Sequence, residues 1–152
     1  MHAVTPYLIK SYHQYNKDKK EQEYFSLNSI RGKDTLEIIH KFMESKSSSV
    51  FDFPSESRVY KFENIEFNPK NRTVSAFLIA GFYGVKSDIL DKNTGEIRFP
   101  KAETDAEVLK HFISFTIPRG RTEGIALFHK SRSVGIKTLF ASLFSPIFRE
   151  QT

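Results

Sequence analysis

Residues 73–85, TVSAFLIAGFYGV, are apolar almost throughout. A strand with this composition is buried on both faces, so we expect residues 73–85 to form a central strand of a sheet. The preceding residues 58–67 mix polar and apolar side chains on both faces. They predict an outer strand, joined to the central one by the turn NPKN. Gly81 and Gly84 predict a bulge or a close approach by another backbone.

Two segments have the 3.6-residue period of a helix that covers a sheet. Residues 34–45, DTLEIIHKFMES, begin with Asp34 at a position that suits a helix cap. The second helix is expected over residues 135–144. The apolar face of the first helix consists of Leu36, Ile39, His40 and Met43.

Alternating or turn-bounded segments predict the remaining strands, and the Ser-rich residues 46–54 predict a surface loop. The sequence therefore predicts a single α+β domain, with a mostly antiparallel sheet of about five to seven strands covered by two helices. The further strands are expected in residues 3–15, in a hairpin over residues 87–99, and in residues 108–117 and 125–130.

Pro146 disfavours helical geometry at the residue before it, so we expect the second helix to end near Ser145. The domain would then span residues 1–144, and residues 145–152 would start a further helix or tail. Such a tail suggests either a longer protein or docking on a partner, including a second copy of the chain. The apolar side chains expected in that interaction are Leu143, Phe144, Ile147 and Phe148.

The composition narrows the protein class. The 152 residues include no Cys, which excludes disulfides and thiolate metal sites, and fifteen Phe, most of which we expect in the core. The N-terminus lacks the pattern of a secretion signal, and no apolar run approaches the roughly 20 residues that a membrane helix needs. We expect a soluble cytoplasmic protein that does not enter a membrane.

Cationic residues gather between residues 118 and 148. Five cationic residues and one acidic residue lie between positions 119 and 137, which gives a local charge of +4, compared with +5 for the whole chain. Backbone N–H groups at a helix start, hydroxyls and guanidinium groups are the donors that hold phosphates. The expected phosphate contacts are Arg119, Arg121, Lys130, Ser131, Arg132, Ser133, Lys137 and Thr138.

These contacts predict a non-enzymatic domain that binds DNA or RNA and needs no cofactor. The two ends of strand 125–130 are roughly 20 Å apart, a span that suits an extended polyanion. Exposed tyrosines near Lys10 would stack on bases. The pattern is not a phosphate-binding loop of ATPases, because Ile136 separates Gly135 from Lys137. A solvated turn in which Ser131 or Ser133 caps the helix stays open as an alternative. The stacking candidates are Tyr7, Tyr12 and Tyr15.

A metal-dependent nuclease is a minor alternative. An Asp and a Glu followed by a basic residue, on adjacent strands, could hold a catalytic metal ion. The five histidines show no metal-binding spacing. The nuclease would use Asp88, Asp91, Glu96 and Arg98.

Two stretches, YGVKSDILDKNTGEIRF (residues 83–99) and GIALFHKSRSVGIKTLF (residues 124–140), resemble uncharacterised bacterial proteins carried by phages, plasmids and defence islands. The resemblance covers about a fifth of the chain. It implies a role in phage–host conflict, in keeping with a nucleic-acid partner, and it brings no catalytic residues.

Overall fold

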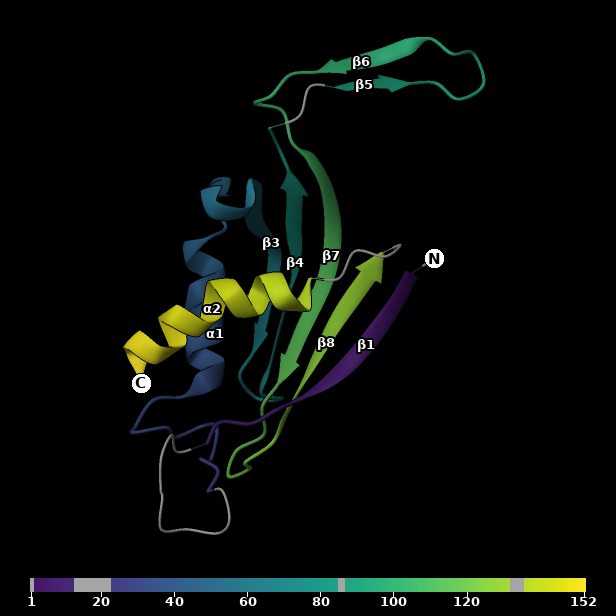
Figure 1. Ribbon diagram of the computed structural model, residues 1–152. Helices are drawn as coiled ribbons and strands as arrows, with labels where there is room; N and C mark the ends of the chain where they lie inside the picture. Colours follow the sequence, from purple (N-terminus) through teal and green to yellow (C-terminus); the bar gives the residue numbers. More distant parts are fainter. Residues whose placement is uncertain (1, 13–22, 85–86, 132–135) are drawn as a thin grey trace.

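An antiparallel six-stranded sheet with two helices on one face forms the body of the molecule (Figure 1). The computed structural model describes residues 2–12, 23–84, 87–131 and 136–152. Across the sheet the strands lie in the order β1-β8-β7-β4-β3-β2. The predicted α+β class is confirmed. The sheet comprises β1 (His2–Ile9), β2 (Phe51–Phe53), β3 (Arg58–Asn68), β4 (Thr73–Phe82), β7 (Glu107–Thr116) and β8 (Gly124–Ser131).

Strand β4 occupies the centre, as its apolar sequence predicts, between β3 and β7. Its side chains alternate, so that one set is buried beneath the helices and the other lies half-buried on the opposite face. The close backbone approach predicted at Gly81 is confirmed, because a Cβ there would lie 1.9 Å from the carbonyl oxygen of Glu107. The buried set consists of Val74, Ala76, Leu78 and Ala80.

Helix α1 (Thr35–Ser45) confirms the prediction for residues 34–45. Asp34 is its N-cap, and its carboxylate accepts a hydrogen bond from the Leu36 backbone N–H at 3.0 Å. This bond satisfies a donor that the first turn of a helix leaves unpaired. On the predicted apolar face, His40 is half-buried and stacks on Phe67, with ring centroids 4.1 Å apart. The fully buried residues of this face include Leu36, Ile39 and Met43.

Helix α2 (Lys137–Gln151) is longer than predicted, since it continues through Pro146 instead of ending at Ser145. A proline removes one helix hydrogen bond and leaves the carbonyl four residues earlier, that of Ser142, without its donor. Both residues are exposed, so water can satisfy this carbonyl. The expected end of the helix near Ser145 is therefore wrong, because residues 145–151 continue α2.

The edges of the sheet also differ from the prediction. The segment 46–54, expected as a loop, contains the three-residue strand β2, which pairs with β3 and moves it one place inward from the edge. A 3-10 turn, η1 (Pro54–Glu56), follows β2. At the other edge, β1 ends at Ile9, whereas a strand over residues 3–15 was expected. Beyond it, Tyr12 forms only an isolated bridge with Tyr24.

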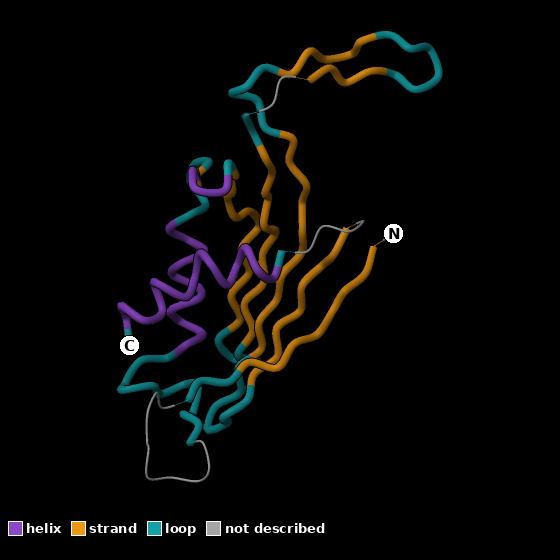
Figure 2. Tube along the Cα trace, in the orientation of Figure 1, coloured by secondary structure: helices purple, strands orange, loops and turns teal. Residues whose placement is uncertain are grey.

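Between β4 and β7 the chain forms a separate two-stranded hairpin, the predicted one over residues 87–99. We call residues 87–101 the arm. It comprises β5 (Ser87–Leu90) and β6 (Ile97–Lys101). Figures 1 and 2 show the arm projecting beyond the end of β4 and β7, clear of the helices. Among the described residues, no helix is both long and apolar enough to cross a membrane.

Candidate functional site

The structure does not bring the predicted phosphate contacts together. Arg119 and Arg121 lie in the exposed turn before β8, whereas Lys130 is exposed next to the far end of that strand. The eight residues of β8 separate these ends by roughly 25 Å. Arg132 and Ser133 lie outside the described residues, and Ser131 is described only as part of β8.

The start of α2 is the second part of the predicted phosphate site. Ile136 stands at the N-cap position, where no side chain accepts a hydrogen bond from the first turn. The ammonium of Lys137 lies 4.6 Å from the ring centre of Tyr7, a cation–π contact that holds it against β1. Thr138 is exposed. Tyr7 itself is half-buried and contacts Phe128 edge-on, so it does not offer a free face for stacking.

A cleft at the opposite end of the molecule gathers cations that the sequence analysis did not group. Its volume is about 700 Å³, and we call it the basic cleft. Its walls come from the end of β1, the loop before α1 and the last turns of α2, and the described residues that line it include three cations and no acidic side chain. The lining residues are Lys10, Ser11, Tyr12, Phe25, Ile30, Arg31, Ser145, Phe148, Arg149 and Thr152.

Backbone hydrogen bonds fix the loops around the basic cleft. The Leu27 N–H donates to the carbonyl of Arg121 at 3.0 Å, and the Gly120 N–H donates to the Asn28 side chain at 2.9 Å. The loop before α1 is thereby tied to the β7–β8 turn. Residue Arg31 adopts a left-handed backbone conformation, with φ of 51°, in the tight turn that follows. The turn cations at 119 and 121 therefore belong to the same end of the molecule as the cleft.

The cations of the basic cleft differ in the contacts that they make within the protein. Lys10 pairs with Glu123 at 3.1 Å and lies 4.9 Å from the ring centre of Tyr24. Arg31 uses one guanidinium nitrogen to donate to the carbonyl of Thr152 at 3.3 Å, which leaves further N–H donors of the fork available. Arg149 is exposed near the end of α2. The cleft thus offers two arginines and a partly neutralised lysine to an anion.

Aromatic side chains stand beside these cations. Tyr12 lines the basic cleft, and 53% of its surface is exposed. Its ring and that of Tyr24 meet edge to face, at a centroid distance of 6.5 Å and an interplanar angle of 82°. Of the two predicted stacking residues that the structure describes, Tyr12 is the exposed one, and it lines the basic cleft. Tyr15 lies outside the described residues.

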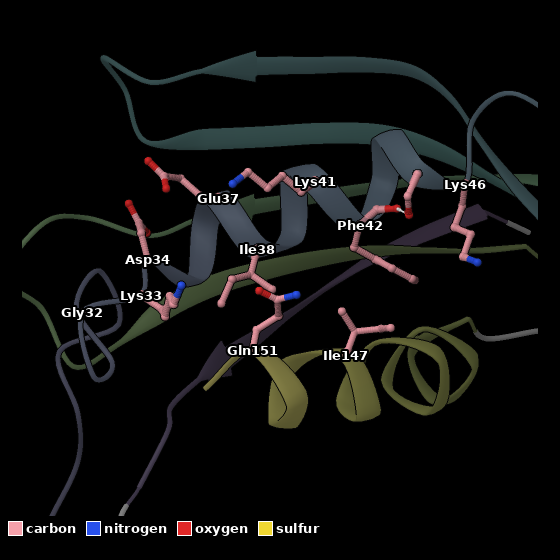
Figure 3. Close-up of a pocket in the computed structure, with 11 residues that line it drawn as sticks. Gly32, Lys33, Asp34, Glu37, Ile38, Lys41, Phe42, Lys46, Ile147 and Gln151 are labelled. Carbon is pink, nitrogen blue, oxygen red and sulfur yellow. Dashed lines mark hydrogen bonds between the residues drawn. The ribbon is translucent and has the colours of Figure 1, made fainter.

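A second groove, of about 480 Å³, lies between α1 and α2 (Figure 3). Figure 3 shows Ile38 and Phe42 of α1 facing Ile147 of α2 across it. Its rim mixes both signs of charge, and one of its carboxylates, Asp34, is held by Arg72. Its charges therefore offset one another, unlike those of the basic cleft.

The apolar side chains of α2 that were expected to dock on a partner pack within the chain instead. Phe144 lies 5.6 Å from Phe42 of α1 and 5.4 Å from Phe140, measured between ring centroids. The four predicted residues are half-buried, so they do not form an open apolar patch. Their contact with a partner stays a prediction. The residues packed against the core here are Leu143, Phe144, Ile147 and Phe148.

The acidic residues of the arm shape its turn. Asp91 accepts hydrogen bonds from the backbone N–H groups of Asn93 and Thr94, and its other oxygen accepts one from Arg98 at 3.2 Å. The two backbone bonds, followed by the Arg98 bond, lower the pKa of Asp91. Within the described residues, no three His, Asp or Glu side chains lie close enough to hold a metal ion. The nuclease alternative therefore has no metal site in this part of the chain.

No protein-family model, curated protein or solved structure matches the chain. The functional argument therefore depends on the geometry alone. Sequence reasoning missed Arg31 and Arg149 because they lie more than 100 positions apart and meet only after α2 packs beside the loop before α1. The one local signal was the pair Arg31-Gly32, which is typical of a tight turn that exposes its side chain.

Proposed function

We propose that this domain binds single-stranded nucleic acid in the basic cleft, without catalysing a reaction on it. The observation that carries the proposal is the lining of the cleft, where Lys10, Arg31 and Arg149 converge. The described lining residues include no acidic side chain, although Glu123 pairs with Lys10 from outside the lining. Such a surface contacts phosphates and releases their counterions, which supplies most of the affinity of sequence-independent binding.

The aromatic side chain in the cleft favours a single strand over a duplex. Tyr12 is half-exposed beside the cations, where an unpaired base could stack on its ring. Stacking of this kind contributes about 1–3 kcal/mol per base, and it tolerates any sequence because every base has a π-face. Bases in a duplex are already stacked, so the same ring would gain little from them.

The turn between β7 and β8 extends the surface along which a strand could run. Arg119 and Arg121 are exposed on this turn, which is hydrogen-bonded to the loop that carries the cleft. These two arginines come from the cluster that the sequence predicted, whereas the cleft itself was not predicted. We infer that the phosphate backbone leaves the cleft towards this turn.

The test is fluorescence anisotropy with labelled oligonucleotides of about 20 thymidines or 20 uridines, titrated with protein at several salt concentrations. For single strands, log K falls with log salt by about 0.7 for each phosphate contact. The double variant Arg31→Gln/Arg149→Gln should therefore reduce the slope by about 1.4 and weaken binding for both oligonucleotides. A matched control is Lys92→Gln, which removes an exposed cation from the arm.

A Tyr12→Ser variant should weaken binding by roughly 5- to 150-fold, the equivalent of one lost stack. Its circular dichroism spectrum should remain that of the parent, because this ring is outside the core. The proposal fails if no oligonucleotide changes anisotropy at about 20 mM salt, where electrostatic binding is strongest. It also fails if Lys92→Gln weakens binding as much as the cleft variant. A role in phage–host conflict remains a prediction from sequence resemblance.

A further inference from the structure

The arm displays more apolar surface than a hairpin of its size can support in water. Four large side chains on it are about half exposed, and they take no part in the core. An isolated two-stranded hairpin is at best marginally stable in water, so an arm of this kind gains stability when another surface covers it. The exposed fractions are 43% for Ile89, 54% for Leu90, 58% for Ile97 and 49% for Phe99.

A second bare apolar surface lies on the sheet face that the helices leave uncovered. On β1, Thr5, Tyr7 and Ile9 are half-buried, while the alternate residues are exposed. Tyr7 contacts the core, so the alternate set points to the opposite face. Leu8 pairs directly with Ile125 of β8, which places both on that open face. We call Val4, Leu8 and Ile125 the β1–β8 strip, and their exposed fractions are 55%, 65% and 48%.

The middle of the same face is screened, unlike the β1–β8 strip. Lys110 lies 5.0 Å from the ring centre of Phe77 and forms an ion pair with Glu63 at 3.7 Å. Lys61 pairs with the same carboxylate at 2.8 Å. The stems of these long side chains cover apolar surface, and their charged heads keep it hydrated. Among the described residues, Val4, Leu8 and Ile125 are about half exposed or more, and the ion pair of Lys10 with Glu123 lies beyond the Leu8–Ile125 end of the strip.

Within one molecule the arm cannot reach Leu8 and Ile125, the far part of the strip. The arm joins the sheet next to Glu107, at the start of β7, whereas Ile125 is in register with Thr116, at the end of β7. Nine residue steps separate these positions, or about 30 Å along the strand. The strands of the arm and their loop reach roughly 15–20 Å. In addition, Figure 1 shows the arm extending away from the β7–β8 turn.

We propose that the arm docks on the β1–β8 strip of a second copy, and that the two copies do this reciprocally in an antiparallel two-fold dimer. Arm and strip lie at opposite ends of β7, so a two-fold axis perpendicular to the strands brings each arm to the other copy's strip. This arrangement closes on itself, as the symmetry of most homo-oligomers requires. It does not depend on the nucleic-acid proposal.

The area supports two contacts rather than one. Successive strand residues point to opposite faces, so Ile89 and Leu90 cannot both face the strip, and one face of the arm offers about 200 Å² beside about 300 Å² from the strip. A single contact of about 500 Å² is in the range of crystal packing, while the two symmetric contacts total about 1,000 Å², the size that a specific interface should reach. The second copy is thus the occupant for which the area suffices.

The charge of the arm allows the same occupant. The arm carries three carboxylates and three cations, a net charge of zero, while the connection at residues 102–107 carries three carboxylates and no cation. The rest of the chain carries +8, because the whole chain carries +5. A neutral arm meets no like-charge repulsion on this basic surface of another copy.

Docking on the face is more favourable than adding a strand at the edge. Pro6 lies in the middle of β1, opposite Leu127. In an edge strand, proline is found where the backbone N–H would point outward. Because proline has no N–H, the free edge lacks a hydrogen-bond donor at this position. A partner strand could not form an uninterrupted ladder of hydrogen bonds along the free edge of β1. The proline does not affect the apolar side chains on the face of the sheet.

Light scattering after size exclusion, at about 10–100 μM protein without nucleic acid, tests the proposal against the affinities typical of such interfaces. We expect a mass of twice 17.6 kDa. Phe99→Ser and Leu8→Ser should each weaken the dimer at least about tenfold, because each truncates an apolar contact at its centre. Val50→Ser should not, since this residue is 59% exposed and belongs to neither surface.

Cysteine cross-linking then identifies the contact, because the chain has no cysteine of its own. A mixture of Ile97→Cys and Leu8→Cys proteins should form a mixed disulfide dimer, while Ile97→Cys alone should not. A protein that is still monomeric at about 100 μM would overturn the proposal. The apolar surface of the arm would then indicate a different protein as its partner. Disulfides between two Ile97→Cys arms, or a dimer unaffected by the serine variants, would overturn it equally.

Discussion

Substitution of Asp34 tests how the first helix is attached to the sheet. Its carboxylate makes two contacts with the guanidinium of Arg72, at 2.6 and 2.8 Å, and it also caps α1 through the Leu36 N–H. Arg72 is buried, and its Nε donates to the carbonyl of Ile117 at 2.9 Å. The hydrogen bond that Arg72 donates to Asp34 is the main cause that raises the pKa of Arg72, so the arginine is charged throughout the accessible pH range.

The magnitude follows from the burial of the two groups. Removal of one member of a buried ion pair costs about 3–5 kcal/mol, because the other charge is left without a partner. The side chains of Asp34 and Arg72 are 13% and 9% exposed, so residual hydration places Asp34→Ala near the lower end, about 3 kcal/mol. Asp34→Asn keeps a cap acceptor, which is worth about 1 kcal/mol, and should therefore cost about 2 kcal/mol.

Urea unfolding at pH 7, monitored by circular dichroism, measures these free-energy costs. Fluorescence should give the same transition, which shows that unfolding is two-state. The double variant Asp34→Ala/Arg72→Met isolates the pair, and the two single costs should exceed the double cost by about 1–3 kcal/mol. Arg98→Met is a matched control, because it breaks an exposed pair with Asp91 and should leave the midpoint unchanged. Single costs that add within about 0.5 kcal/mol would refute the reasoning.

Two further predictions concern β4 and β7. Gly81→Ala should destabilise the domain by about 1–3 kcal/mol in urea, because the new methyl group would collide with the Glu107 carbonyl and force the strands apart; an unchanged midpoint would contradict this. His111 is buried, and burial is the main cause that lowers its pKa. The unfolded chain therefore binds this proton more readily, so stability should fall as the pH drops from about 7.5 to 5.5. His111→Gln should flatten that dependence, and an equal slope in both proteins would locate the effect elsewhere.

Local patterns were sufficient to predict the framework. The apolar run of residues 73–85 was placed at the centre of the sheet, and the periodicity of residues 34–45 marked α1 and its cap. These predictions succeed because the burial of two strand faces, or of one helix face, requires a regular pattern of apolar residues within a short stretch of sequence. The hairpin that became the arm was also predicted, since Gly95 and its neighbours are typical of a turn.

Features that depend on distant contacts were not predicted. Strand β2 has three residues and exists only because β3 offers it an edge. Helix α2 continues through Pro146 because its apolar side chains pack on α1, and this tertiary contact outweighs the local preference of a proline. The basic cleft draws its cations from segments far apart in sequence. The buried pair between Asp34 and Arg72 likewise joins residues 38 positions apart.

Both proposed surfaces have one structural cause, the incomplete cover that two helices give to a six-stranded sheet. Helix α1 packs against β3 and β4. Of the side chains of α2 itself, only Leu139 and Phe140 are fully buried. Consequently β4 has a buried residue at every second position, whereas no described side chain of β1 is fully buried. Near β1 the sheet is therefore open on both sides, with the basic cleft on the helix side and the β1–β8 strip on the reverse. Because the last turns of α2 line the cleft and the strip lies on the face without helices, a dimer formed through the arms leaves both clefts accessible.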